Sequence, residues 1–200
     1  MNHFFGRPLA KAKTDRRDWY RVTNAADDTV RVDIYDFIGY DPWWDEGVDA
    51  KKFVKDLGEI RASTIDLHIN SPGGYVTDGI LIYNALRDHS ARIVVTVDAL
   101  AASAASFIAM AGDEVVMNRH SELMIHDPLM LCAGNAEDMK KCAEDLDRVG
   151  DRIAGIYAAR TGAADETWRA AMLEETWYSA QEAVDVGLAN RVIEDEPRET

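Results

Sequence analysis

Residues 64–74 read TIDLHINSPGG, an alternating strand that runs directly into a proline and two adjacent glycines. Residues 92–97 (RIVVTV) form a second apolar segment, rich in β-branched residues, which indicates a buried central strand. Amphipathic segments at 49–61, 76–88 and 136–160 predict helices that alternate with these strands. Such alternation predicts an α/β domain built on a largely parallel sheet.

The composition fits one globular domain. The chain has 200 residues, of which 47% are apolar and 29% charged. We expect a single domain at residues 21–194, a flexible N-terminal tail at 1–20 and an acidic C-terminal tail at 195–200. The formal net charge of −14 argues against a nucleic-acid partner, because phosphates would be repelled. No apolar segment is long enough for a signal peptide or a membrane span, so we expect a cytoplasmic protein.

The chain contains two cysteines, Cys132 and Cys142, which lie on either side of the start of the helix predicted at 136–160. Disulfides persist in oxidising compartments and are rare in the cytosol. Because nothing in the sequence indicates secretion, we expect both cysteines to be reduced thiols.

The loop Asn70–Gly74 is a candidate binding element. Adjacent glycines allow a ligand to lie against bare backbone N–H groups, and Pro72 removes one donor and fixes the approach. An ordinary strand-to-helix turn explains the same residues. The loop is followed by no Gly-Lys-Ser/Thr, so we expect no nucleotide phosphate to bind there.

Ser103 lies among alanines at the predicted junction between the strand at 92–97 and a helix that ends near Ala111. Backbone N–H groups at the start of a helix lack intrahelical partners and suit an oxyanion, and small neighbours let a substrate backbone come close. The alternative is a serine N-cap of a tightly packed helix, which is far commoner than a nucleophile.

His126 ends an apolar strand and is a candidate general base for such a serine. A structural histidine at a strand edge is the competing interpretation. A third group would have to orient the imidazole, and Glu175 is the candidate, with Glu174 and Asp185 nearby; each is also typical of a solvated surface carboxylate. The remaining histidines are alternatives by residue type alone: His3, His68, His89 and His120.

Four segments, taken in order, resemble successive motifs of the ClpP proteases. They are INSPGG at 69–74, VDALAASAASFIAMAG at 97–112, MIHDP at 124–128 and YSAQEAVDVGL at 178–188. The resemblance implies a ClpP/crotonase-like spiral of β-β-α units, with the helix at 136–160 as a protruding handle. It also implies a serine endopeptidase without metal or cofactor that assembles into a homo-oligomeric ring, a heptamer or double ring, and can work with an ATPase unfoldase.

Carried over by position, the resemblance makes Ser103 the nucleophile and His126 the general base. The backbone N–H groups of Gly74 and Ala104 become the oxyanion hole. The family's catalytic aspartate falls on Ala171, which cannot orient an imidazole. Glu175, one helical turn later, is our substitute.

Three further departures concern assembly and substrate binding. A Glu-Arg pair that helps to join two rings in the family is replaced by Arg169-Ala170. The glycine-rich strand that follows the histidine, where substrate pairs by β-augmentation, is replaced by LMLCAG at 129–134, and Asp127 replaces a glutamine. The loss of the Glu-Arg pair argues against the usual ring–ring pairing.

The N-terminal third, with WYRVTNA at 19–25, resembles ClpP-like head maturation proteases of phages and prophages. That resemblance implies scaffold and capsid proteins as substrates, in the cytoplasm of a bacterial host or in the prohead. A general degradative subunit that works with an ATPase is the alternative. Two other classes remain: a crotonase-like acyl-CoA enzyme, and a non-catalytic ring scaffold, for which Ala171 leaves room.

Overall fold

The computed structural model describes residues 18–24, 28–41 and 46–194. It confirms an α/β fold with an eight-stranded sheet, whose main path runs in the order β1-β2-β5-β6-β7-β10. Strand β8 pairs with β6 and also with β9. The strands of this sheet are β1 (Tyr20–Asn24), β2 (Thr29–Tyr35), β5 (Thr64–Ser71), β6 (Arg92–Ala102), β7 (Glu114–Asn118), β8 (Glu122–Ile125), β9 (Thr176–Ser179) and β10 (Arg191–Ile193). Most of both predicted tails, residues 1–17 and 195–200, lies outside the described residues.

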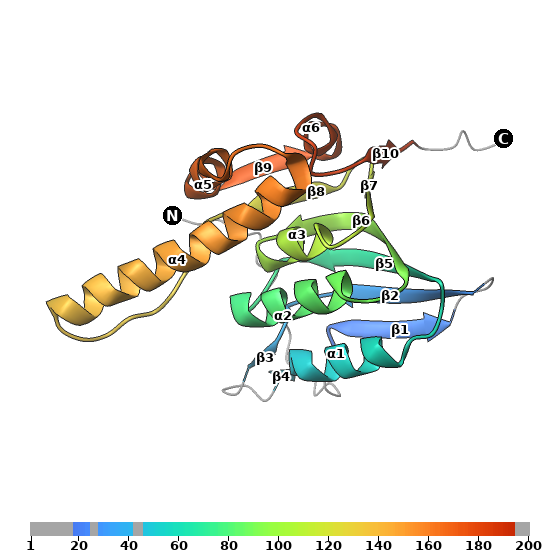
Figure 1. Ribbon diagram of the computed structural model, residues 1–200, viewed down its shortest axis with the longest axis horizontal. Coiled ribbons are helices and arrows are strands. Elements are labelled where there is room, and N and C mark those ends of the chain that lie inside the picture. The colour runs from blue at the N-terminus through green and yellow to red at the C-terminus, as the bar shows by residue number, and fades with distance from the viewer. Residues whose placement is uncertain (1–17, 25–27, 42–45, 195–200) are drawn as a thin grey trace, which may run out of the picture.

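Three helices lie in front of the sheet in Figure 1, namely α1 (Ala50–Glu59), α2 (Val76–Arg87) and α3 (Ala104–Ala109). Alternation in β5 explains this layering, because Ile65, Leu67 and Ile69 are fully buried while the residues between them are only partly buried. Helix α1 begins at Asp49, whose carboxylate accepts a hydrogen bond from the Lys51 N–H. A separate two-stranded ribbon consists of β3 (Tyr40–Asp41) and β4 (Glu46–Gly47).

Parallel pairing brings the ends of three strands to one edge of the sheet. Strand β5 pairs in parallel with β6, and β6 pairs in parallel with β8. Opposite Ala101 of β6 lies Ser71 of β5 on one side and Leu123 of β8 on the other. The carboxyl ends of these strands therefore meet where the glycine loop, Ser103 and His126 follow them. Strand β6 extends beyond the segment predicted at 92–97, as far as Ala102, and α3 begins at Ala104, so Ser103 lies at a strand-to-helix junction as predicted.

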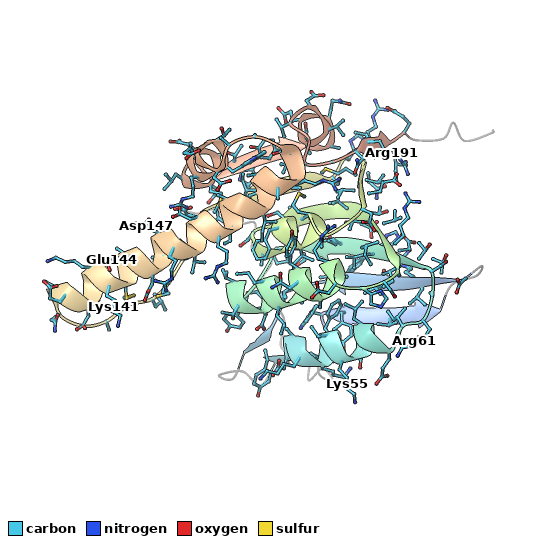
Figure 2. The ribbon with its side chains drawn as sticks, in the orientation of Figure 1. Lys55, Arg61, Lys141, Glu144, Asp147 and Arg191 are labelled. Carbon is cyan, nitrogen blue, oxygen red and sulfur yellow. A yellow bond between two sulfur atoms is a disulfide. The ribbon has the colours of Figure 1, made fainter. Side chains whose placement is uncertain are left out.

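The longest helix, α4 (Ala136–Thr161), projects from the body of the molecule (Figure 1). Its buried residues all lie in the second half, from Gly150 to Ala158, where the helix packs beside α5 (Asp165–Leu173). The apolar face of this predicted amphipathic helix is therefore covered only at the inner end, and Met139 is exposed. Charged residues such as Lys141, Glu144 and Asp147 lie along the projecting half (Figure 2). Helix α6 (Ala180–Asp185) follows β9.

Cys132 and Cys142 form a disulfide, which corrects our expectation of two reduced thiols. Residues 128–135 run outward along the projecting half of α4 to its free end (Figure 1), and the Cα atoms of the two cysteines are 6.6 Å apart. That separation lies within the range that a disulfide can span. The bridge fixes this segment to α4 although Leu129 and Leu131 beside it are 81% and 103% exposed.

No helix in the described ranges is both long enough and apolar enough to cross a bilayer. Helix α4 has the required length, but Asp, Glu, Lys and Arg recur throughout it. The apolar segments of the sheet are short strands instead.

Candidate active site

Ser103 lies in the tight turn between β6 and α3, with φ 53° and ψ −123°. A residue that carries a Cβ is strained in this conformation by roughly 1–3 kcal/mol. Its N–H donates to the Met124 carbonyl at 3.0 Å, which holds the turn against β8. Ser103 is the N-cap residue of α3, yet its hydroxyl makes no capping hydrogen bond. The hydroxyl is therefore available for another partner.

That partner is His126, whose Nε2 lies 2.8 Å from the Ser103 Oγ. The histidine directly follows β8, and parallel pairing of β8 with β6 places Met124 beside Ala102, next to the serine. Burial lowers the pKa of His126 below its ordinary value, and the negative charges of Glu175 and Asp127 oppose this shift. A lowered pKa keeps the imidazole neutral near pH 7, which is the form that can accept a proton.

Glu175 follows α5 with a positive φ of 49° and is the predicted third member. Its carboxylate raises the pKa of His126 through its charge. Among the side chains that the structure describes, the hydrogen bond of Glu175 is with the Trp177 indole N–H, at 3.4 Å, and none joins it to His126. The carboxylate thus acts on the imidazole at a distance, and its role as an orienting group stays a prediction.

The glycine loop lies directly against the serine turn. A Cβ built on Gly73 would lie 2.7 Å from the Ser103 Cβ and 2.8 Å from the Ala104 backbone nitrogen. Gly73 also has a φ of 96°, which favours glycine. Within the described residues, the N–H groups of Gly74 and Ala104 donate no hydrogen bond. Both N–H groups are therefore free to bind an oxyanion, and their role as an oxyanion hole stays a prediction.

Contacts from two neighbouring segments hold the loop in place. The buried Ser71 donates from its hydroxyl to the Asp36 carbonyl at 2.6 Å and accepts from the Gly73 N–H at 3.0 Å. Ile38 donates to the Gly73 carbonyl at 2.8 Å and accepts from the Tyr75 N–H at 3.1 Å. Neither anchor was predictable from the sequence, because Asp36 and Ile38 contribute backbone groups and lie far from the loop in the chain.

A buried pair of hydroxyls supports the serine turn from behind. Ser106 donates to the Ser103 carbonyl at 2.5 Å, and its Oγ lies 2.7 Å from the Tyr157 hydroxyl of α4. Burial raises the pKa of Tyr157, so this group stays a neutral phenol. The inner half of α4 is therefore connected to the backbone of Ser103.

The other described histidines lie elsewhere. His68 binds Asp98 and Asp66 on the outer face of the sheet, at 2.9 Å and 3.2 Å. His89 accepts a hydrogen bond from the Ala91 N–H in the loop after α2. In the part of the chain that the structure describes, no group of three metal-binding side chains is clustered.

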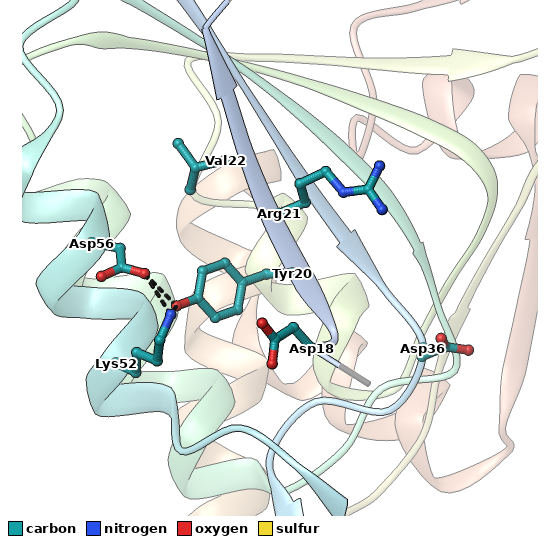
Figure 3. Close-up of a pocket in the computed structure, with 7 residues that line it drawn as sticks. All are labelled: Asp18, Tyr20, Arg21, Val22, Asp36, Lys52 and Asp56. Carbon is teal, nitrogen blue, oxygen red and sulfur yellow. Dashed lines mark hydrogen bonds and ion pairs between the residues drawn. The ribbon is translucent and has the colours of Figure 1, made fainter. Parts of the chain in front are cut away.

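A surface cavity of about 560 Å³ lies between β1 and α1, away from Ser103 and His126 (Figure 3). Three of its polar groups bond to one another, since the Tyr20 hydroxyl donates to Asp56 at 2.6 Å and accepts from Lys52 at 2.7 Å. Neither Ser103 nor His126 lines this cavity, so it contributes nothing to the site.

The sequence pattern of the Clp protease family matches residues 50–196, a span that contains Gly74, Ser103, Ala104, His126 and Glu175. The chain belongs to the Clp protease family. Membership of this family makes the chain a serine-type peptidase of the ClpP kind.

Individual relatives agree with this assignment. The chain is 36% identical over 128 residues to an ATP-dependent Clp protease proteolytic subunit of Pleurastrum terricola, covering 63% of this chain and 65% of that protein. It is 34% identical to proteolytic subunit 1 of Prochlorococcus marinus subsp. pastoris, covering 66% of this chain and 69% of that protein. It is 31% identical to proteolytic subunit 2 of Pseudomonas aeruginosa, covering 75% of this chain and 79% of that protein.

Proposed function

We propose that the chain hydrolyses peptide bonds through an acyl-enzyme at Ser103. The observation that carries this proposal is the 2.8 Å contact between the Ser103 Oγ and the His126 Nε2. Ser103 attacks the scissile carbonyl carbon while its proton passes to His126. The negative oxygen that results is bound by the N–H groups of Gly74 and Ala104.

The remaining steps return every group to its starting state. The C–N bond breaks as His126 gives its proton to the leaving amine. Water then attacks the acyl-enzyme and passes a proton to His126, the ester bond to Ser103 breaks, and the serine recovers its proton. Glu175 stabilises the imidazolium in both halves of the reaction by its charge.

The chain is proposed to act in the cytoplasm as one subunit of a homo-oligomeric ring that receives protein substrates from an ATPase partner. The printed names of the relatives, which describe proteolytic subunits of an ATP-dependent protease, support this role. The uncovered projecting half of α4 supports assembly, because an isolated chain leaves it without a packing partner.

Maturation of phage heads, with scaffold and capsid proteins as substrates, is the second candidate. The observation that favours it is the β1–β2 hairpin, which precedes the residues that match the Clp protease family. The ATP-dependent role has support from the named relatives, and we therefore rank it first.

Other classes fit the site less well. A crotonase-like acyl-CoA enzyme also holds an oxyanion with backbone N–H groups, but a serine bonded to a histidine has no task in that reaction. A non-catalytic ring scaffold has no need of the strained Ser103 backbone, which costs roughly 1–3 kcal/mol.

The test is hydrolysis of an unfolded protein and of the same protein in its folded form, with the wild type and Ser103→Ala side by side. We expect the wild type alone to cleave the unfolded substrate, and the folded substrate to need a cognate ATPase and ATP. Cleavage of folded capsid or scaffold protein without ATP would favour the head maturation role. Equal activity of Ser103→Ala would contradict both.

A further inference from the structure

Arg169 of α5 is largely buried, with 17% of its side chain exposed, and it contacts three aspartates. Its Nη1 binds the Asp127 carboxylate, its Nε lies 3.0 Å from Asp151, and its Nη2 lies 3.4 Å from Asp147. Asp127 directly follows His126, whereas Asp147 and Asp151 belong to α4. One guanidinium thus connects the histidine segment with two helices.

The local geometry is built around this side chain. A Cβ on Gly150 would lie 2.1 Å from the Arg169 Nη1, so the guanidinium crosses α4 where that helix has no side chain. Asp127 is held a second time by its N–H, which donates to the Met172 carbonyl of α5 at 3.0 Å. A planar fork with several donors suits such a bridge, whereas the single ammonium of lysine does not.

The charge of Asp127 matters to catalysis because of its place in the chain. Its carboxylate is one of two negative charges that act on His126, the other being Glu175. The groups that face Asp127 are Arg169 from α5 and, through the same guanidinium, Asp147 and Asp151 from α4. An Asp127 carboxylate without its arginine would act on the imidazole as an uncompensated charge.

We propose that Arg169 is a positioning residue for His126: it clamps the Asp127 segment to α4 and α5 and neutralises the carboxylate beside the imidazole. This inference rests on the proposed function, in which His126 is the general base. Arg169 occupies the position of one member of the Glu-Arg pair that helps to join two rings in the family, and the inference gives it a different function in this chain.

The experiment measures the rate of Ser103 modification by a fluorophosphonate from pH 5 to 9, using the full chain. In Arg169→Gln we expect a lower maximal rate (the plateau of the pH profile). We also expect the fall of the rate on the acid side (the acid limb) to move to higher pH by about half a pH unit or more, because the freed Asp127 favours the imidazolium. In Arg169→Gln/Asp127→Asn the acid limb should return to, or lie below, that of the wild type. Arg148→Gln, which removes an equal charge and an ion pair from α4, should match the wild type.

Arg169→Lys keeps the charge and loses the fork, so its acid limb should stay in place while its plateau rate falls. This variant carries the test if Arg169→Gln does not fold. A folded Arg169→Gln whose acid limb is unmoved, or an Arg169→Lys with the full wild-type rate, would overturn the inference while leaving the proposed function intact. A wild type that is never modified at Ser103 would overturn the proposed function itself.

Discussion

Ser103 and the two glycines beside it determine the geometry of the reacting centre. Alanines on both sides of Ser103 let the strained turn approach Gly73, which could not carry a side chain there. The strained turn is held by the hydrogen bond that the Ser103 N–H donates to the Met124 carbonyl and by the one that Ser106 donates to the Ser103 carbonyl, and Ser106 is itself bonded to Tyr157. The serine is therefore held in place before a substrate binds.

Gly73→Ala tests this close approach. The added methyl group would collide with Ser103 and Ala104 and would force a positive φ on alanine. We expect hydrolysis to fall by about 10²-fold or more, since loss of one oxyanion donor has that effect. Gly58→Ala is the control, because a Cβ at that position in α1 meets nothing within 4 Å. Equal rates for the two variants would contradict the proposed oxyanion hole.

Glu175→Gln tests the third member of the site. Because Glu175 raises the pKa of His126, its neutralisation should lower that pKa and move the acid limb of the pH profile to lower pH. In the absence of a hydrogen bond to the imidazole, we expect the plateau rate to fall by about tenfold or less, not the ~10⁴-fold typical of a fully bonded triad. Glu174→Gln, which alters the neighbouring carboxylate, should leave the profile unchanged. A large loss of rate in Glu175→Gln would show that the carboxylate orients His126 directly.

At the scale of elements, the parallel strands explain how residues far apart in sequence meet. The ends of β5, β6 and β8 deliver the glycine loop, Ser103 and His126 to one edge of the sheet. The inner half of α4 supports this edge through Tyr157, while its outer half is connected to residues 128–135 by the disulfide.

Reduction of the disulfide tests the second of these connections. The bridge closes a short loop between residues separated by 10 positions in the chain, and it anchors a segment with exposed leucines. We expect a reductant to increase amide hydrogen exchange in residues 128–135 and in the outer turns of α4, with the sheet unaffected. In Cys132→Ser the same reductant should cause no further change. Unaltered exchange in the wild type after reduction would contradict an anchoring role.

The sequence predicted elements better than it predicted contacts between them. Periodicity located β5, α2 and α4 to within one or two residues, because each buries one regular face. It did not predict that β6 extends to Ala102, since alanine has no strong preference for a strand. The disulfide and the Arg169 cluster were also missed, because both depend on how segments pack in space.

At the scale of the whole molecule, the site combines the sheet edge where β5, β6 and β8 end, the strained turn at Ser103, and α4, which projects from the body of the molecule. Ser103 and His126 were predictable because the order and spacing of the four motifs resemble a known family. The assignment of Glu175 in place of the family's aspartate stays a prediction, since Ala171 removes the usual signal and the structure links Glu175 to His126 by charge, without a hydrogen bond. The projecting half of α4 is the surface to which we assign the proposed assembly (Figure 1).

The most direct measurement is fluorophosphonate labelling of the assembled protein, with the modified residue located by mass spectrometry. The Ser103–His126 contact predicts a single adduct on Ser103 in the wild type, and none in Ser103→Ala or His126→Ala. Labelling should decline as the pH falls through the lowered pKa of His126, below its ordinary value of 6.5. An assembled, folded wild type that gives no adduct on Ser103 would contradict the assignment of an activated serine.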